Sequence, residues 1–378
     1  MKKLLTVIGA RPQFIKAAAI SRTLNDAFKG RIEEKILHTG QHYDNAMSNV
    51  FFDEMNIPRP HFTLQSGGGS HGAQTAAMLE GIEEVLLGEK FDGLLVYGDT
   101  NSTLAGALAA AKLYIPVIHV EAGLRSFNKA MPEELNRIMC DHASTLLFCP
   151  TDTAVHNLRQ EGFDVTNDHK PTADHPAVHK CGDIMFDNTL YFSNISRDKF
   201  HSQPPFTITR KFVLATIHRP YNTDDGARLL AILSDLEWLT TQGFDVVFPI
   251  HPRTLKAAEL ANAQRLTELK ANVHFHLVPP ASFLEMIYLE QGSELIVTDS
   301  GGVQKEAYFL RKPSVVVRTE TEWTELIDHG SAILCFETGE AMRSAFLSQL
   351  NKQFSDFPPI FGDGHAATFI CQKIVEAL

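Results

Sequence analysis

The sequence predicts an α/β protein of two Rossmann-like domains with a central cleft. Short β-branched apolar runs alternate with segments of helical period along all 378 residues. Such runs are typical of buried parallel strands, and the helices between them cover both faces of the sheet. The number of runs exceeds what one doubly wound sheet comfortably holds, and the chain is long enough for two domains.

The expected strands fall into two sets. Those of the first half lie at 4–10, 34–40, 93–99, 115–123 and 145–151. Those of the second half lie at 211–219, 244–253, 272–278, 294–300 and 314–318. Segment 164–207 lacks periodicity and is rich in Pro, His and Asp, which indicates a break between domains. We therefore expect domains at 1–180 and 181–362.

Composition excludes several classes of protein. The net charge of −11 argues against a general surface for nucleic acid or an anionic membrane. The apolar run at the start is interrupted by Arg11 and Pro12, too early for a signal peptide, and no later run spans a bilayer. The five cysteines have no metal-ligand spacing, and no HExxH motif is present. We expect a cytoplasmic protein without a bound metal.

Two helix starts are candidate anion sites. In "GARPQFIK" (9–16), Arg11 and Lys16 flank the opening of the first helix. In "TDSGGVQKEA" (298–307), Ser300, Gly301 and Gly302 follow an apolar strand and open another helix. Free backbone N–H groups at a helix start bind anions, and glycines allow a phosphate to approach closely. Each motif alone is equally consistent with an ordinary capped turn. Lys305 is expected at the surface.

Carboxylates and histidines recur at the ends of the expected strands. Asp99 in "YGDTNST", Glu121 in "HVEAGLRS" and Glu133 in "MPEELNR" follow or begin successive elements of the first half. Capping and helix dipoles explain any one of them, but three together could supply an acid and a base. In the second half, His218 in "TIHRPYN" and the "HPR" of 251–253 place a histidine beside an arginine. The absence of Walker A, GxGxxG and GxSxG motifs removes three common enzyme classes.

Taken in order, these motifs resemble the non-hydrolysing UDP-N-acetylglucosamine 2-epimerase family. The resemblance extends over nearly the whole chain, to "GDGHAA" at 362–367. It implies a fold similar to the GT-B glycosyltransferases, a second domain that binds UDP, and a final helix at 363–378 that packs back on the first domain. It also implies a homodimer that needs no cofactor and acts on a UDP-sugar.

The resemblance implies a role for each matched residue. The family's catalytic carboxylates correspond to Asp99, Glu121 and Glu133, and its catalytic histidine to His218. The diphosphate contacts correspond to Arg11, Lys16, Ser300, Gly301 and Gly302. The residue that holds the ribose hydroxyls corresponds to Glu306. The family eliminates UDP across C1–C2 to give a glycal and then adds UDP back with the C2 proton on the other face. This chemistry needs a base, an acid and stabilisation of a departing anion.

Two departures from the family pattern are visible. Tyr221 stands where the family commonly has glutamate in His-Arg-x-Glu-Asn. The loop at 64–75 lacks the arginine with which some members bind a second UDP-N-acetylglucosamine, so that kind of activation is not expected.

Several motifs, including "TETEWTELID" (319–328), look closest to the epimerases of UDP-2,3-diacetamido-2,3-dideoxyglucuronate. That sugar carries a carboxylate, for which the candidate contacts are Arg125, Arg219, Arg253 and His71. UDP-N-acetylglucosamine remains the main rival substrate. Alternatives to the whole assignment are a hydrolysing 2-epimerase, a GT-B glycosyltransferase and a silent nucleotide-sugar binder.

Overall fold

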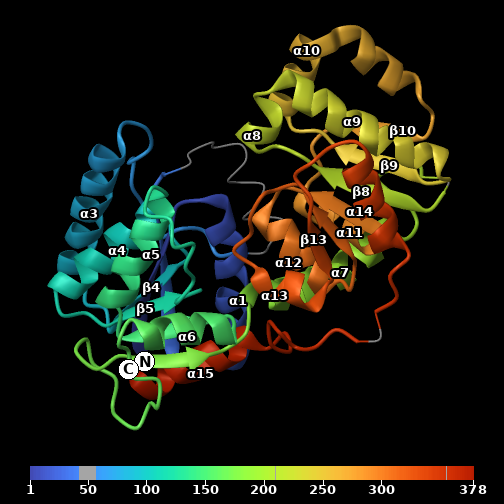
Figure 1. Cartoon of the computed structure of the whole chain (residues 1–378). Helices are drawn as coiled ribbons and strands as arrows, with labels where there is room; N and C mark the ends of the chain where they lie inside the picture. Colours follow the sequence, from blue (N-terminus) through green and yellow to red (C-terminus); the bar gives the residue numbers. More distant parts are fainter. Residues whose placement is uncertain (42–56, 209, 355) are drawn as a thin grey trace. The chain divides into compact units, whose positions relative to one another are not determined.

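The computed structural model describes residues 1–41, 57–208, 210–354 and 356–378 and divides the chain into two compact units (Figure 1). Unit 1 comprises Met1–Asn188 and Pro359–Leu378, and unit 2 comprises Thr189–Pro358. Each unit contains one parallel sheet with helices packed on it. The predicted fold class, two Rossmann-like α/β units, is confirmed. Residues 181–188, which the sequence placed in the second domain, count with unit 1.

The sheet of unit 1 has seven strands in the order β3-β2-β1-β4-β5-β6-β7. Their bounds are β1 Lys2–Ile8, β2 Ile32–His38, β3 Phe62–Thr63, β4 Gly93–Tyr97, β5 Val117–Val120, β6 Leu146–Cys149 and β7 Ala177–Lys180. All neighbours pair in parallel. The strand order reverses between β1 and β4, and ligands of open parallel sheets bind at such a switch point, beyond the carboxyl ends of the strands.

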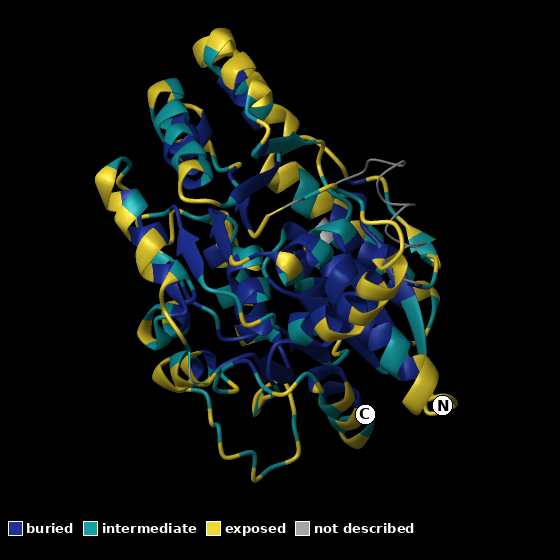
Figure 2. Ribbon diagram, turned by 90° about the vertical axis from the view of Figure 1, so that its right-hand side faces the viewer, coloured by how far each residue is buried: buried dark blue, intermediate teal, exposed yellow. Residues whose placement is uncertain are grey.

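The helices of unit 1 connect these parallel strands. Their bounds are α1 Arg11–Ala27, α3 His71–Gly88, α4 Asn101–Lys112, α5 Pro132–Ala143, α6 Asp152–Gln160 and α15 Ala366–Ala377. Helix α7, Ile184–Phe200, begins in unit 1 and ends in unit 2. Figure 2 shows the central strands coloured mostly as buried and the outer faces of the helices as exposed, which is the distribution expected for a sheet covered by helices.

The sheet of unit 2 has six parallel strands in the order β10-β9-β8-β11-β12-β13. Their bounds are β8 Phe212–Thr216, β9 Asp245–Pro249, β10 Phe275–Val278, β11 Leu295–Thr298, β12 Ser314–Val316 and β13 Ala332–Leu334. The helices are α8 Pro220–Thr223, α9 Gly226–Thr241, α10 Pro252–Ala271, α11 Phe283–Gly292, α12 Gly301–Phe309, α13 Thr324–His329 and α14 Glu340–Leu350. Here the switch point falls between β8 and β11.

The last segment of the chain returns to unit 1. Helix α15 packs against α1, and Asp187 caps its first turn by accepting hydrogen bonds from the N–H groups of Ala366 (3.1 Å) and Ala367 (2.8 Å). Burial raises the pKa of Asp187 to about 6 although both N–H groups favour the charged form. No helix in the described parts of the chain is both long and apolar enough to span a membrane.

Candidate functional site

The switch point of unit 1 brings two carboxylates to neighbouring strand ends. Asp99 follows β4, and Glu121 follows β5, whose residue Val120 pairs with Tyr97. Glu121 has a φ of 73°, a left-handed conformation that is strained for a residue with a long side chain. Strain of this kind is concentrated at functional sites, and here it determines the direction in which Glu121 leaves the sheet.

Lys16 forms an ion pair with Glu121. The Lys16 Nζ donates to Glu121 Oε2, and the two side chains are only 10% and 12% exposed. Gly98 makes room for this pair, because a Cβ at that position would lie 3.2 Å from Glu121 Oε2 and 3.3 Å from Lys16 Nζ. Its φ of 63° is also the kind that glycine adopts without strain. The pair is therefore built into the turn after β4.

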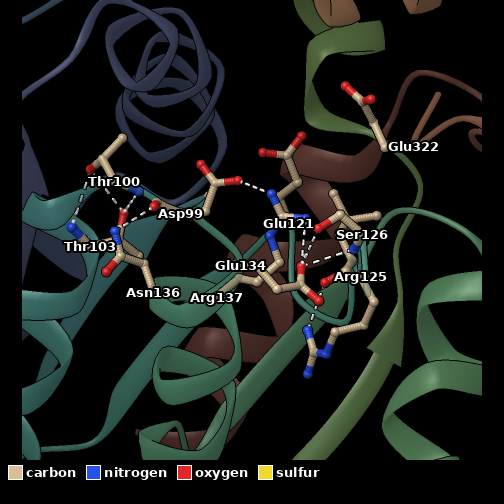
Figure 3. Close-up of polar contacts among 12 residues, drawn as sticks. Asp99, Thr100, Thr103, Glu121, Arg125, Ser126, Glu134, Asn136, Arg137 and Glu322 are labelled. Carbon is tan, nitrogen blue, oxygen red and sulfur yellow. Dashed lines mark hydrogen bonds and ion pairs between the residues drawn. The ribbon is translucent and has the colours of Figure 1, made fainter. Parts of the chain in front are cut away.

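Asp99 has a cation of its own. Its Oδ2 accepts from the guanidinium of Arg137 on α5, and its carbonyl oxygen accepts from Asn136 Nδ2 at 2.9 Å (Figure 3). Burial raises the pKa of Asp99, Arg137 and Lys16 oppose that rise, and Glu121 adds to it. A carboxyl group whose pKa is raised toward neutrality holds and releases a proton more readily at physiological pH.

The two glutamates of "MPEELNR" differ in their surroundings. Glu134 is buried and accepts from Ser126 N (2.8 Å), Ser126 Oγ (2.9 Å), Phe127 N (2.9 Å) and Arg137 (3.2 Å), as Figure 3 shows in part. Glu133, the residue matched to the family's catalytic carboxylate, is exposed in the first turn of α5. It makes no hydrogen bond or ion pair with any residue that the structure describes. Glu134 thus orders the loop at 126–127, while the Glu133 carboxylate stays accessible.

A buried charged network lies directly behind these strand ends. His119 on β5 contacts the Gly98 carbonyl oxygen through Nε2 (2.7 Å) and Asp141 through Nδ1 (2.7 Å). Asp141 also accepts from Gly123 N (3.1 Å) and Arg125 Nη1 (2.7 Å). A carbonyl and a carboxylate both require donors, so His119 is an imidazolium. Burial lowers its pKa, but Cys140 and Asp141 outweigh that effect and the pKa lies well above the usual value.

This network corrects the assignment of Arg125 as a sugar contact. The Arg125 side chain is 1% exposed, and besides Asp141 it donates to Glu161 through Nε (2.6 Å) and Nη2 (2.7 Å). A guanidinium that is buried and already engaged with two carboxylates has little to offer a ligand. Arg125 instead ties α5 and α6 to the turn after β5.

In unit 2, His218 lies after β8 and is held by Asp299. The buried Asp299 carboxylate accepts from the N–H groups of His218 (3.0 Å) and Arg219 (2.9 Å) and from Asn222 Nδ2 (3.0 Å). His218 Nδ1 lies 3.2 Å from Asp299 Oδ1, and its side chain is 44% exposed. Burial lowers the pKa of His218, partly opposed by Asp299. Tyr221 projects toward Phe336 and leaves Asn222 in place, so the departure from the family pattern does not disturb this contact.

The helix start after β11 has the geometry of an anion cradle. Ser300 caps α12 by accepting from Val303 N at 3.5 Å, and Gly301 and Gly302 are its first two residues. A Cβ on Gly301 would lie 2.4 Å from Glu322 Oε1. The second oxygen of that carboxylate, Glu322 Oε2, accepts a hydrogen bond from Arg318 at 2.9 Å. Gly302 has open space around it, with Ser300 Oγ at 3.9 Å. Glycine at these two positions adds no side chain over the N–H groups of the first turn of α12, although the Glu322 carboxylate lies close to Gly301.

The two residues one turn into α12 do not behave as the sequence indicates. Lys305 is only 4% exposed, and its Nζ lies 4.2 Å from the centroid of a Trp323 ring. The expectation of a surface lysine is wrong, because Trp323 of the next loop covers it. Glu306 is half-buried and hydrogen-bonds to the carboxyl group of Glu290 on α11.

The remaining candidates occupy different settings. Arg253 is exposed and forms an ion pair with Asp224 at 2.7 Å. Arg219 caps α8, and its guanidinium makes no hydrogen bond or ion pair with the rest of the described chain. His71 is the exposed first residue of α3, with Nδ1 3.3 Å from Asn101 Nδ2. Arg11 begins α1, and its side chain lies outside the described residues.

Sequence reasoning missed the residues that support the predicted ones. They are Arg137, Glu134, Asp141 and Asp299. Asp299 directly follows β11 and precedes Ser300, so its place at a strand end was a usable signal. Glu134 and Arg137 lie in α5, whose packing the sequence does not indicate. Asp141 lies at the far end of α5, and only the packing of that helix on β5 reveals its role. Among residues 1–41, 57–208, 210–354 and 356–378, no cluster of three or more His, Cys, Asp or Glu side chains could hold a metal ion.

Fold and strand-end residues together define a GT-B-like α/β protein with ionisable groups at the switch point of each sheet. Comparison with known sequences then identifies the family. A model of the UDP-N-acetylglucosamine 2-epimerase family matches residues 26–375. The chain belongs to this family.

Relatives with known names support the assignment over the full length. The chain is 43% identical to the UDP-2,3-diacetamido-2,3-dideoxy-D-glucuronate 2-epimerase of Pseudomonas aeruginosa, covering 99% of both chains. It is 45% identical to a UDP-N-acetylglucosamine 2-epimerase homolog of Methanococcus maripaludis, covering 100% of this chain and 99% of the relative. The crystal structure of the Methanocaldococcus jannaschii UDP-GlcNAc 2-epimerase with UDP-GlcNAc and UDP superimposes with a TM-score of 0.82 at 39% identity, covering 99% of both chains.

Proposed function

We propose that this protein inverts C2 of a UDP-linked N-acetylated sugar by eliminating UDP to a glycal and adding it back. The observation that carries the proposal is the pair of carboxylates at adjacent strand ends, Asp99 and Glu121, each opposed by a buried or half-buried cation. A nucleotide-sugar binder or a glycosyltransferase has no need of two such groups. Family membership supports the same reaction.

The proton-transfer groups come from unit 1. The C2 proton is not adjacent to a carbonyl, so its removal must accompany loss of the C1 leaving group. A carboxylate removes that proton, and a second acidic group returns one to the opposite face. Asp99 and Glu121, with the accessible Glu133, are the candidates. The Arg137 and Lys16 partners restrain Asp99 and Glu121 and stabilise their charged forms between proton transfers.

The leaving group is stabilised by unit 2. The N–H groups of Gly301 and Gly302 and the hydroxyl of Ser300 bind the diphosphate of UDP, and the helix dipole of α12 favours its negative charge. His218 lies after the neighbouring strand of the same switch point and donates to the departing phosphate oxygen. Glu306 accepts from the ribose hydroxyls, and Arg11 and Lys16 are the further diphosphate contacts that the family resemblance implies. Charge develops on UDP as the C1–O bond breaks, so these contacts act most strongly in the transition state.

The substrate is UDP-N-acetylglucosamine or UDP-2,3-diacetamido-2,3-dideoxyglucuronate. The Pseudomonas aeruginosa relative is named for the second sugar, and the archaeal relatives for the first. The carboxylate of the glucuronate requires a cation, and Arg219 suits this role best because its guanidinium is not engaged by other described residues. Arg253 and His71 are the other candidates. We further propose a cytoplasmic homodimer, as the resemblance implies, which light scattering of the purified protein would test.

Incubation with each sugar nucleotide in D2O, followed by NMR at C2, tests the reaction. The proposal predicts deuterium at C2 and a UDP-linked epimer, with only traces of glycal and UDP. Free N-acetylmannosamine as the main product would instead identify a hydrolysing epimerase. Absence of exchange with both sugars would refute the assignment.

His218→Ala tests the proposed role of His218 in stabilising the leaving group, separately from proton transfer by the carboxylates. We expect exchange to be abolished while the far-UV circular dichroism and melting temperature stay close to those of the wild type. His201→Ala is the matched control, because His201 is exposed and lies outside both switch points. Turnover near the wild-type rate in His218→Ala would show that this histidine is misassigned.

A further inference from the structure

Behind Glu306 lies a buried carboxyl group that the proposed reaction does not use. Glu290 is on α11, in the turn before the Gly292 that ends that helix, and is 1% exposed. Its carboxyl group hydrogen-bonds to Glu306 on α12. Its Oε2 has no donor within hydrogen-bond distance anywhere in the described chain. No cation of the described chain is among the groups that act on this carboxyl.

Two carboxyl groups in direct contact cannot both be ionised in a buried setting. One of them must keep a proton and donate it to the other. Glu290 is the more deeply buried, and Glu306 is half-buried, so the charge is least costly on Glu306. Burial and the neighbouring Glu306 both raise the pKa of Glu290 well above its ordinary value.

We propose that Glu290 is a positioning residue, a protonated acid that donates to Glu306 and fixes the oxygen that Glu306 presents to the ribose of UDP. The inference rests on the proposed function of α12 as the UDP site. A lone glutamate on a helix surface has several rotamers, and its ordering costs binding free energy. A donor from α11 selects one rotamer before the nucleotide arrives, which is preorganisation of the acceptor.

The surroundings of Glu290 contain few other charges. Glu285 on the same helix is used in the capping box of α11, and Glu294 after the helix faces Lys211 at 3.4 Å. Lys305 on α12 directs its Nζ to the Trp323 ring. Glu306 is the group whose charge and hydrogen bond act on Glu290. A change in the ionisation of Glu290 is therefore transmitted first to Glu306.

Two variants at position 290 separate donation from simple packing. Glu290→Gln keeps a donor of nearly the same shape but cannot ionise, and Glu290→Leu fills the space without a donor. We expect Glu290→Gln to bind UDP within about threefold of the wild type at pH 7, and Glu290→Leu to bind about tenfold more weakly. With 2′,3′-dideoxy-UDP, which lacks the ribose hydroxyls, all three proteins should bind equally.

The pH dependence gives a second readout that packing alone would not change. As pH rises through the raised pKa of Glu290, the acid loses its proton and two carboxylates then repel each other. The wild type should lose UDP affinity as the pH rises through that raised pKa, whereas Glu290→Gln should not. UDP ionises identically in both titrations, so the ratio of the two dissociation constants isolates Glu290.

The outcomes distinguish the inference from the proposed function. If the wild type fails to bind UDP, or binds dideoxy-UDP equally well, the assignment of α12 and Glu306 is wrong. If the wild type discriminates the two ligands but Glu290→Leu does so equally well, the positioning role alone is overturned. If Glu290→Leu does not fold, parallel pH profiles of the wild type and Glu290→Gln would overturn it independently.

Discussion

The two switch points of the molecule present different chemical groups, charged side chains in unit 1 and backbone N–H groups in unit 2. In unit 1 the strand ends carry fixed charges in opposed pairs, Lys16 with Glu121 and Arg137 with Asp99, above a buried layer of further charges. In unit 2 the corresponding place is a serine cap and two glycines at the start of α12, where the donors belong to the backbone. Proton transfer needs groups that ionise, whereas holding an anion needs only oriented N–H groups. Under the proposed function, this contrast assigns proton transfer to unit 1 and binding of the anion to unit 2.

Among the variants considered, Asp99→Asn should reduce the rate of deuterium exchange the most. A small effect would contradict the contrast between a proton-transferring unit 1 and an anion-binding unit 2. The amide keeps the shape and can still contact Arg137, but it cannot accept or return a proton. We expect deuterium exchange at C2 to fall by about 10²–10⁴-fold with UDP affinity nearly unchanged. Asp152→Asn is the control, because Asp152 is an exposed partner of Lys180. Exchange within tenfold of the wild type would remove Asp99 from the reaction.

Asp141→Asn tests whether the buried layer of unit 1 depends on charge. Asp141 faces both His119 and Arg125, and its neutralisation leaves the buried His119 without its carboxylate partner, while Arg125 keeps only Glu161. We expect the free energy of unfolding to fall by about 3–5 kcal/mol in urea titrations. Asp164→Asn, at an exposed loop position, should change it little. A loss below about 1 kcal/mol for Asp141→Asn would show that the network tolerates an uncompensated charge.

Gly301→Ala examines the anion cradle of unit 2. The added methyl would approach Glu322 Oε1 to 2.4 Å, which displaces that flexible carboxylate and narrows the access to the N–H groups of α12. We expect UDP to bind about tenfold more weakly, which corresponds to about 1.4 kcal/mol, with the fold intact. Gly88→Ala, where a methyl meets nothing within 4 Å, is the control for calorimetric titration. Unchanged UDP affinity in Gly301→Ala would place the diphosphate elsewhere.

Ser300→Ala should have the smallest effect on UDP affinity. It tests whether the Ser300 hydroxyl of unit 2 binds the anion or only caps α12. Loss of the cap costs about 0.5–2 kcal/mol of stability, and loss of one hydroxyl from the anion site should weaken UDP binding a few-fold. Ser70→Ala removes the equivalent cap of α3, which accepts from Ala73 N at 3.4 Å. Both variants should melt at lower temperature, but only Ser300→Ala should lose UDP affinity. Equal affinities would limit Ser300 to capping.

Every strand expected from apolar runs is present, because strands covered by helices on both faces of a parallel sheet are largely apolar. The short strand β7 and helix α7 fall in 164–207, where Pro, His and Asp obscured the pattern. Strand β7 at the sheet edge has only two buried apolar residues, Ala177 and Val178, followed by half-buried His179 and exposed Lys180, so it lacks a continuous apolar run. Edges of sheets are therefore harder to predict than their centres.

The site was predictable to the extent that its residues follow strands. Asp99, Glu121, His218 and Ser300 all do, and a parallel sheet brings such positions together. The partners that hold them were not predictable, because Arg137 and Asp141 act from a helix whose rotation depends on packing. The prediction that Lys305 lies at the surface was wrong for the same reason, since nothing in the neighbouring sequence indicates that Trp323 covers it.

The return of the chain to unit 1 has a consequence for the order in which the protein is made. Unit 1 needs residues 359–378, whose helix α15 packs on α1 and is capped by Asp187, but unit 2 is contained within 189–358. A ribosome therefore synthesises all of unit 2 before the last helix of unit 1. Unit 1 cannot be completed until synthesis of the whole chain has ended, although its sheet is made first, so its folding does not simply follow the usual N-to-C order.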